Sequence, residues 1–239
     1  MSSLQRFGTV YAGFYYPKNL PGLDESSIIY CVGAGEDISH DIEIAHALGS
    51  HVHIFDPTPR SIEHVALVKK VLDKEVEPVK DTRYGGGDPK YWTRILENPI
   101  PSERVHMYEY GLHTSDISGV KFYMPTNTAH VSHSLVDGMR GTKFVKVDVK
   151  CLKTIMNELG HTKIDLLKID IEGSECAVLD QMCAESIFPT YLSVDFDLAG
   201  TGERMRDMER CKETMKKLET YGYTRLHSEG FNHSFQRII

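Results

Sequence analysis

The sequence has no excess of basic residues, no long apolar run and no paired-cysteine motif. Its net charge is −7 with histidine neutral. This argues against nucleic acid as the main partner, because phosphate contacts require clustered Lys and Arg. No apolar run approaches the roughly 20 residues of a membrane span, and the N-terminus lacks the apolar core of a signal peptide. Five scattered cysteines without a Cys-x-x-Cys pair are typical of reduced thiols, so we expect a cytoplasmic protein.

What the chain does contain is an alternation of apolar strand runs and amphipathic helical stretches. Strands are predicted near 28–32, 51–55, 104–109, 164–169, 190–196, 223–227 and 232–238. Helices are predicted near 38–48, 59–73, 151–159, 173–183 and 203–220. Asp37 is the predicted N-cap of the first helix, and Gly49 its predicted stop. The pattern predicts an α/β fold with a doubly wound, mostly parallel seven-stranded sheet that ends in an antiparallel C-terminal hairpin.

The length suits a single domain over residues 1–239. Residues 1–25 are rich in aromatic and turn-forming side chains, and we expect them to form an N-terminal lid or edge. Two irregular stretches, 80–102 and 125–142, are predicted to be loop insertions. Short strands near 120–124 and 143–149 flank the second of them.

A glycine turn and an acid have the spacing of a nucleotide site. The first strand runs into Gly33-Ala34-Gly35, and the second strand ends at Asp56. Gly33 and Asp56 are 23 residues apart, close to the roughly 20 expected between such a turn and the acid that binds ribose hydroxyls. The pattern predicts that an adenosine-containing ligand binds beyond these strand ends.

The details of the turn argue against a dinucleotide. Ile38 stands where the dinucleotide fingerprint has its third glycine. Glu36 and Asp37 place negative charge where a pyrophosphate would bind. A ligand with a ribose, no phosphate and a positive centre suits this turn better, and S-adenosylmethionine (SAM) is such a ligand. A tight turn with no ligand and an NAD(P) oxidoreductase stay open as alternatives.

Three segments, 32–41, 55–59 and 166–175, together resemble the FkbM-type SAM-dependent methyltransferases. The most specific is Lys168-Ile-Asp-x-Glu-Gly-x-Glu, and the resemblance covers about residues 10–200. It implies a class I methyltransferase fold that uses SAM to methylate hydroxyls of sugars or polyketide-like products. It also implies that the cofactor contacts Gly33, Gly35, Glu36, Asp37, Asp56, Gly111, Leu112 and Asp170.

Methyl transfer to a hydroxyl requires alignment and a base. The resemblance places Asp170 and Glu172 beside the reaction centre, and Asp170 follows a buried strand, where desolvation would make it a better base. Simpler interpretations are that Asp170 caps the next helix and that Glu172 is a first-turn acid. His133 is a further candidate base. The predicted substrate-binding residues are His130, Ser132, His133 and Asp195.

The end of the fifth strand departs from the family pattern. Relatives often have Glu-Phe-His there, whereas this chain has Asp195-Phe196-Asp197. Asp170, Asp195 and Asp197 could together bind Mg²⁺ or Ca²⁺, although we expect no metal. Lys168 is interpreted equally well as a catalytic residue or as half of an ion pair.

The resulting hypothesis is a SAM-dependent O-methyltransferase acting on a carbohydrate or glycan hydroxyl. The alternatives are a divalent-metal-dependent O-methyltransferase of a non-sugar small molecule and a degenerate binding module. The oligomeric state stays open.

Overall fold

The computed structural model describes residues 3–79, 81, 83–124, 142–196 and 204–238. Its centre is a seven-stranded sheet with strand order β11-β12-β10-β9-β3-β4-β5. Its strands in chain order are β3 (Ile29–Val32), β4 (Val52–Phe55), β5 (Val105–Tyr108), β9 (Leu166–Ile169), β10 (Tyr191–Asp195), β11 (Tyr223–Glu229) and β12 (Asn232–Arg237). The five strands from β10 to β5 are parallel. The predicted seven-stranded, mostly parallel sheet is therefore confirmed.

The last two strands complete the sheet, and of the two only β12 runs against the others. β12 pairs antiparallel with β10 on one side and with β11 on the other, so β11 and β12 form a hairpin at one edge of the sheet. Parallel neighbours need crossover connections, and helices supply most of them. The helices are α1 (Ser39–Leu48), α2 (Pro59–Leu72), α3 (Tyr91–Glu97), α4 (Leu152–Leu159), α5 (Glu175–Ala184) and α6 (Arg204–Thr220).

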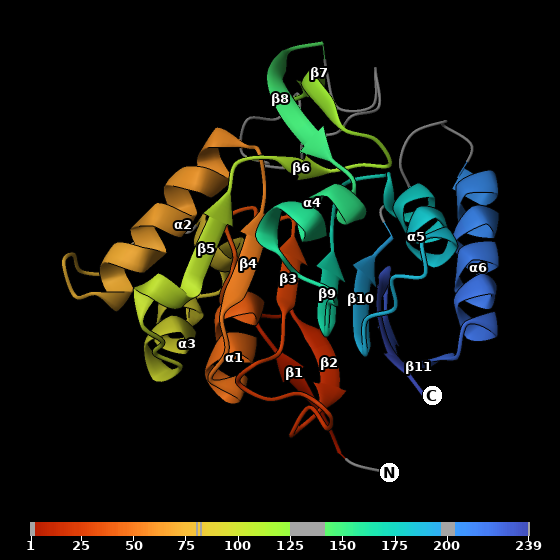
Figure 1. Cartoon of the computed structure of the whole chain (residues 1–239). Helices are drawn as coiled ribbons and strands as arrows, with labels where there is room; N and C mark the ends of the chain where they lie inside the picture. The colour runs from red at the N-terminus through yellow and green to blue at the C-terminus, as the bar shows by residue number, and fades with distance from the viewer. Residues whose placement is uncertain (1–2, 80, 82, 125–141, 197–203, 239) are drawn as a thin grey trace.

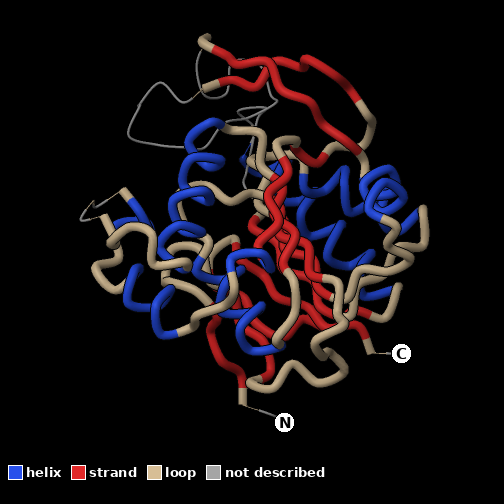
Figure 2. Tube along the Cα trace, turned by 60° about the vertical axis from the view of Figure 1, so that its left-hand side comes forward, coloured by secondary structure: helices blue, strands red, loops and turns tan. Residues whose placement is uncertain are grey.

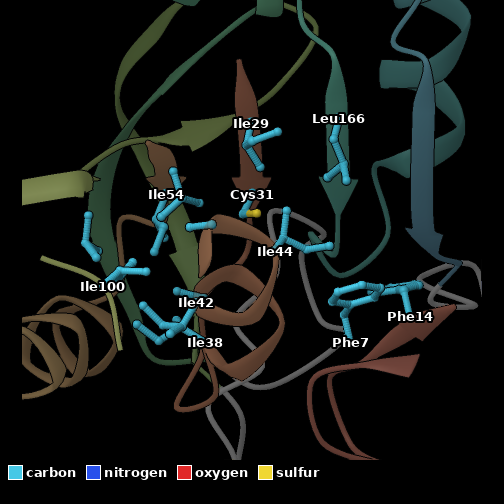
Figure 3. Packing of buried hydrophobic residues seen from close by; sticks show 14 of the residues in the cluster. Phe7, Phe14, Ile29, Cys31, Ile38, Ile42, Ile44, Ile54, Ile100 and Leu166 are labelled. Atoms are coloured by element: carbon cyan, nitrogen blue, oxygen red, sulfur yellow. The ribbon is translucent and has the colours of Figure 1, made fainter. Parts of the chain in front are cut away.

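Helices cover both faces of the sheet (Figures 1 and 2). Along β3, Ile29 and Cys31 pack into one core cluster, and Tyr30 and Val32 into the other, as expected for side chains that alternate across a strand. The first cluster joins the sheet to α1, α2 and α3, and the second joins it to α4, α5 and α6. Figure 3 shows the first cluster, with Ile29 and Leu166 of the sheet near Ile44 of α1.

The predicted ends of the first helix are partly correct. α1 ends at Gly49, whose φ of 67° lies in the left-handed region that glycine tolerates. At the other end, Ile38 is the N-cap residue and no side chain caps the helix. Asp37 instead accepts hydrogen bonds from the Ser39 backbone N–H and hydroxyl, at 2.9 and 2.6 Å.

A separate three-stranded sheet lies above the carboxyl ends of the large one (Figure 1). Its strands are β6 (Gly111–Leu112), β7 (Ile117–Tyr123) and β8 (Phe144–Lys150), with β8 in the middle. The sequence predicts β7 and β8 as short strands, and the structure pairs them antiparallel. Of the predicted loop 125–142, residues 125–141 lie outside the described part of the chain.

The sequence predicts a loop insertion over 80–102, but in the structure this stretch is not a loop throughout. It contains a short 3₁₀ segment, Tyr84–Gly87, and then α3, which is seven residues long. Tyr91 and Ile95 of α3 are buried in the core, and the Tyr91 hydroxyl lies 2.7 Å from His64 Nε2. Two turns of helix after three glycines give too weak a periodic signal to be recognised in the sequence, so tertiary packing decides this element.

The N-terminal segment forms its own hairpin. β1 (Leu4–Phe7) pairs antiparallel with β2 (Phe14–Pro17), and β2 contacts β11 and β12. The Tyr16 side chain is fully buried, and its hydroxyl accepts a hydrogen bond of 2.7 Å from the Ser193 hydroxyl of β10.

No helix in the described part of the chain combines the length and the apolar character that a bilayer crossing requires.

A cluster of histidine rings lies on the β3–β4–β5 side of the sheet. Tyr30, His53 and His106 are cross-strand partners, and the His53 and His106 rings stack with centroids 4.9 Å apart. His51 Nδ1 lies 2.8 Å from His106 Nε2, a hydrogen bond that requires one neutral ring. His161 packs edge-on against His53. Burial, followed by the charges of neighbouring histidines, lowers the pKa of His53 to about 3.

We expect the free energy of unfolding to fall as the pH is lowered below about 6.5, the ordinary histidine pKa. Because the pKa of His53 is lower in the folded protein, the unfolded chain binds protons first. The contribution of neutral His53 to the free energy of unfolding is therefore complete above about pH 6.5 and is lost progressively toward pH 3. His53→Phe keeps a stacked ring without the titrating group, so it should flatten this slope. Urea denaturation between pH 7.5 and 5 measures it.

His46→Gln is the matched control, because His46 lies outside the cluster and contacts the Pro99 carbonyl instead. This variant should keep the wild-type slope. Equal slopes in His53→Phe and the wild type would show that the histidine cluster does not couple folding to pH.

Candidate functional site

A pocket opens where β3, β4 and β9 end. Because these strands are parallel neighbours, their carboxyl ends share one edge of the sheet, where ligands of such sheets bind. Five segments line it: the N-terminal turn, the glycine turn after β3, the Asp56–Thr58 turn, the loop after β9 and the small sheet. The predicted residues that line it are Gly33, Gly35, Asp37, Asp56, Gly111, Leu112, Asp170 and Glu172.

Gly33, directly after β3, lies against the chain at the end of β9. Its φ is +84°, and a Cβ built on it would lie 1.9 Å from the Asp170 carbonyl oxygen. No other residue fits, on grounds of both backbone conformation and space. The Gly33 N–H donates to the Phe55 carbonyl at 3.0 Å, and the Asp170 N–H donates to the Val32 carbonyl at 3.0 Å. These bonds fix three strand ends against one another.

Asp56 organises the glycine turn. Its Oδ2 accepts hydrogen bonds from the Ala34 and Gly35 N–H groups at 2.9 and 3.1 Å. Its Oδ1 accepts from the Thr58 N–H and hydroxyl at 2.8 and 2.7 Å. Four bonds match the number of lone-pair sites of a carboxylate. The sequence predicts Asp56 as a ribose ligand. In this structure its carboxylate instead accepts hydrogen bonds from the glycine turn and from Thr58.

Lys168 is a buried cation beneath the pocket. The residue is 1% exposed, and Nζ donates to the Gly33 carbonyl at 2.7 Å. Asp41 Oδ2 lies 3.9 Å from Nζ. Burial alone would lower the pKa of Lys168, but the charges of Asp41 and Asp170 outweigh it and raise the pKa. Lys168 thus positions the glycine turn. The sequence left open whether Lys168 is a catalytic residue or half of an ion pair, and these contacts favour the ion pair.

Asp41 is the counter-charge of Lys168. It is fully buried, and burial would raise its pKa, but Lys168 and His40 lower the pKa to about 2. Cys31, His40 and Asp41 have ligand atoms within 4.8 Å of one another, and they form the one such potential metal-binding group among the described residues. The Lys168 ammonium already neutralises Asp41 and would repel a divalent cation, so we assign a buried ion pair here.

Tyr11 is a pocket residue that the sequence did not single out. It belongs to a turn that is tied to α1, since the Thr9 hydroxyl donates to Asp37 Oδ2 and the Thr9 N–H donates to Ser39 Oγ at 2.9 Å. The Tyr11 ring packs over Gly86, where any Cβ would clash with it. Such a contact between distant segments leaves no local signal in the sequence.

The charges of several acids act on the Tyr11 hydroxyl. Partial burial, followed by the negative charges of four acids, raises the pKa of Tyr11 to about 12; the acids are Asp170, Glu172, Asp37 and Asp195. The phenol is therefore neutral and can donate a hydrogen bond at neutral pH. A neutral donor amid several carboxylates is an arrangement that favours cationic or hydroxyl-bearing ligands.

The loop after β9 is shaped by an acid of its own. Glu175 is buried, and its Oε1 accepts hydrogen bonds from the Ile171 and Gly173 N–H groups at 3.3 and 2.9 Å. Glu172 has a φ of 60°, a conformation that costs energy for a residue with a side chain. α5 begins at Glu175 with Ser174 at the N-cap, so the interpretation of Asp170 as a helix cap is wrong.

The small sheet contributes an apolar part to the pocket. Leu112, Phe122 and Val149 line it beside Pro57. A Cβ on Gly111 would lie 3.4 Å from Val149 and 3.5 Å from Pro57, so these groups form one surface. The pocket thus combines an apolar surface with a group of carboxylates.

Several predicted residues lie elsewhere. Glu36 does not line the pocket; its carboxylate accepts hydrogen bonds from the Arg60 guanidinium. Glu36 is therefore paired with Arg60 outside the pocket lining, which argues against the predicted contact with the cofactor. Asp195 ends β10 and influences Tyr11, but it is not a lining residue. The candidates His130, Ser132, His133 and Asp197 lie outside the described residues.

Comparison with known proteins identifies a family. The methyltransferase FkbM domain family matches residues 29–235. Among solved structures, the chain is similar to the methyltransferase FkbM from Methylobacillus flagellatus KT, with a TM-score of 0.48 and 12% sequence identity. That match covers 92% of this chain and 46% of the other, so the chain spans less than half of that protein. No curated protein matches the chain.

The role of Lys168 can be tested by removing its charge. Lys168→Met leaves Asp41 buried without a counter-charge and the Gly33 carbonyl without its donor. We expect the free energy of unfolding to fall by about 3–5 kcal/mol, the usual cost of breaking a buried pair. Lys168→Met combined with Asp41→Asn should recover a large part of that loss. Urea denaturation of the wild type, both single variants and the double variant forms the cycle. Strictly additive losses would refute the pairing.

Proposed function

Because the chain belongs to the FkbM methyltransferase family, we propose that it is a SAM-dependent O-methyltransferase that acts on a carbohydrate hydroxyl. The strand order and the helices on both faces of the sheet support a doubly wound class I methyltransferase fold. The carbohydrate acceptor rests on the family resemblance of the sequence.

The observation that carries the proposal is the charge of the pocket. Asp37, Asp170 and Glu172 line it, and Lys168 is the one cation among the lining residues that the structure describes. The Lys168 ammonium is already engaged by the Gly33 carbonyl. A pyrophosphate would meet uncompensated negative charge there, which is costly. A sulfonium would be stabilised by the same carboxylates, and the apolar surface around Leu112 and Val149 suits an adenine ring.

The ribose of SAM can form a hydrogen bond with Asp56 while the hydrogen bonds between Asp56 and the glycine turn are kept. The Thr58 hydroxyl lies between Asp56 Oδ1, at 2.7 Å, and Ser61 Oγ, at 2.6 Å. Its proton can rotate to Ser61, which leaves one lone-pair site of Oδ1 for a ribose hydroxyl. Asp56 then keeps its bonds to the Ala34 and Gly35 N–H groups while it binds the sugar.

When bound, SAM supplies an electrophilic methyl group on a positively charged sulfur. The chain's own task is to orient an acceptor hydroxyl in line with that methyl and to take its proton. Asp170 follows directly on β9 at the pocket wall, and we assign it this role, with Glu172 beside it. We assign to the neutral Tyr11 hydroxyl, which also lines the pocket, a hydrogen bond donated to the acceptor oxygen.

We expect SAM and S-adenosylhomocysteine to raise the thermal unfolding temperature and NAD to leave it unchanged. Asp56→Asn should weaken SAM binding by about 2–3 kcal/mol, because an amide cannot accept on both sides as a carboxylate does. Isothermal titration calorimetry measures the affinity. Glu36→Gln is the control, since Glu36 lies outside the pocket and should change SAM affinity little. If a folded Asp56→Asn variant binds SAM with unchanged affinity, Asp56 does not bind the ribose.

Asp170→Asn keeps the shape of the side chain and removes the charge. Loss of a general base typically costs about 10²–10⁴ in rate, so we expect kcat to fall at least about a hundredfold while SAM affinity changes much less. Transfer of a labelled methyl group from SAM to a panel of free and nucleotide-linked sugars measures turnover. Glu172→Gln and His133→Ala are compared in the same assay. Near-normal turnover in Asp170→Asn with an inactive His133→Ala would assign the base to His133, in the predicted loop 125–142.

A further inference from the structure

Two cysteines from different helices lie side by side. Cys176 is the second residue of α5, and Cys211 lies within α6. Their Sγ atoms are 3.8 Å apart, both residues are half-buried, and neither is part of a disulfide. The two helices pack against each other (Figure 1). A disulfide bond measures about 2.05 Å, so the two sulfurs need to approach by only about 1.8 Å, the scale of a small side-chain rotation.

The surroundings of Cys176 favour its thiolate, which is the reactive form. Hydrogen bonds from Cys211 and Thr214 and the nearby Arg210 guanidinium outweigh the effect of burial and lower the pKa of Cys176 to about 7. Cys176 also lies in the first turn of α5, where the helix N-terminus stabilises negative charge. Cys183, by contrast, is buried on α5, and burial raises the pKa of its thiol.

We propose that Cys176 and Cys211 form an oxidisable thiol pair, a modification site whose substrate is hydrogen peroxide and whose product is a disulfide between α5 and α6. The Cys176 thiolate attacks one peroxide oxygen, the O–O bond breaks, and hydroxide leaves and is protonated to water. The Cys211 thiol then attacks the sulfur of the resulting sulfenic acid, loses its proton, and displaces the second oxygen as water. Two thiols and one peroxide thus give one disulfide and two waters.

The position of the pair connects it to the pocket. Cys176 directly follows Glu175, whose carboxylate holds the Ile171 and Gly173 N–H groups of the pocket loop. α6 is the next helix after β10, which ends at Asp195. The disulfide would therefore fix the first turn of α5, and with it the base of that loop, against α6. This inference does not depend on the proposed methyl transfer, because it concerns the thiols alone.

The test treats the reduced full-length protein with hydrogen peroxide in slight excess. We expect the number of thiols that react with a chromogenic disulfide reagent under denaturing conditions to fall from five to three. The intact mass should fall by about two hydrogens, and peptide mapping should recover the Cys176–Cys211 link. The thermal unfolding temperature should rise by several degrees and return on reduction, because a cross-link restricts the unfolded chain.

Single variants separate the two roles. Cys211→Ser should stop the reaction at the Cys176 sulfenic acid, which dimedone traps, and Cys176→Ser should abolish the link. Cys151→Ser is the control, since Cys151 is a half-buried thiol outside the pair, and it should form the link normally. Peroxide that leaves five thiols, links other cysteines, or gives only sulfinic or sulfonic acids would overturn the proposal. Sulfenic acid that forms at Cys151 before Cys176 would overturn it as well.

Discussion

The buried hydrogen bond from the Lys168 ammonium to the Gly33 carbonyl is the interaction on which the rest of the site depends. β9 lies between β3 and β10 in the middle of the sheet, where an unpaired charge would be prohibitively costly. Asp41 supplies the counter-charge from α1. The ammonium therefore joins three elements, and it fixes the turn that follows β3 at Gly33, where any Cβ would clash with the Asp170 carbonyl.

The acids near the pocket divide into those that hold the chain and those that face a ligand. Asp56 accepts four bonds within the chain, Glu175 accepts two from the loop after β9, and Glu36 is paired with Arg60. A carboxylate is well suited to such work because it accepts several N–H groups at once. The acids that line the pocket in the loop after β9 are Asp170 and Glu172, and their negative charge favours a cationic ligand over a phosphate.

The N-terminal hairpin completes the site from a distance. Gly8 N–H donates to Glu43 of α1 at 2.9 Å, and Thr9 bonds to Asp37 and Ser39. These contacts hold the turn that carries Tyr11 and Ala12 at the pocket wall. A segment that precedes the sheet in the sequence thus becomes part of the site through hydrogen bonds to the first turns of α1, whose own position is set by the core beneath it.

The seven strands of the large sheet, the helices other than α3, the glycine turn at Gly33, the end of α1 at Gly49 and the placement of Asp56 and Asp170 at strand ends could all be predicted from the sequence. These features depend on hydrophobic period and turn chemistry, which act over a few residues. The direction of each acid, the burial of α3, the entry of Tyr11 and the pairing of Cys176 with Cys211 could not. Each depends on side chains brought together from separate elements, so only the packing of the chain in three dimensions decided which of its many carboxylates hold the fold and which of them face the pocket.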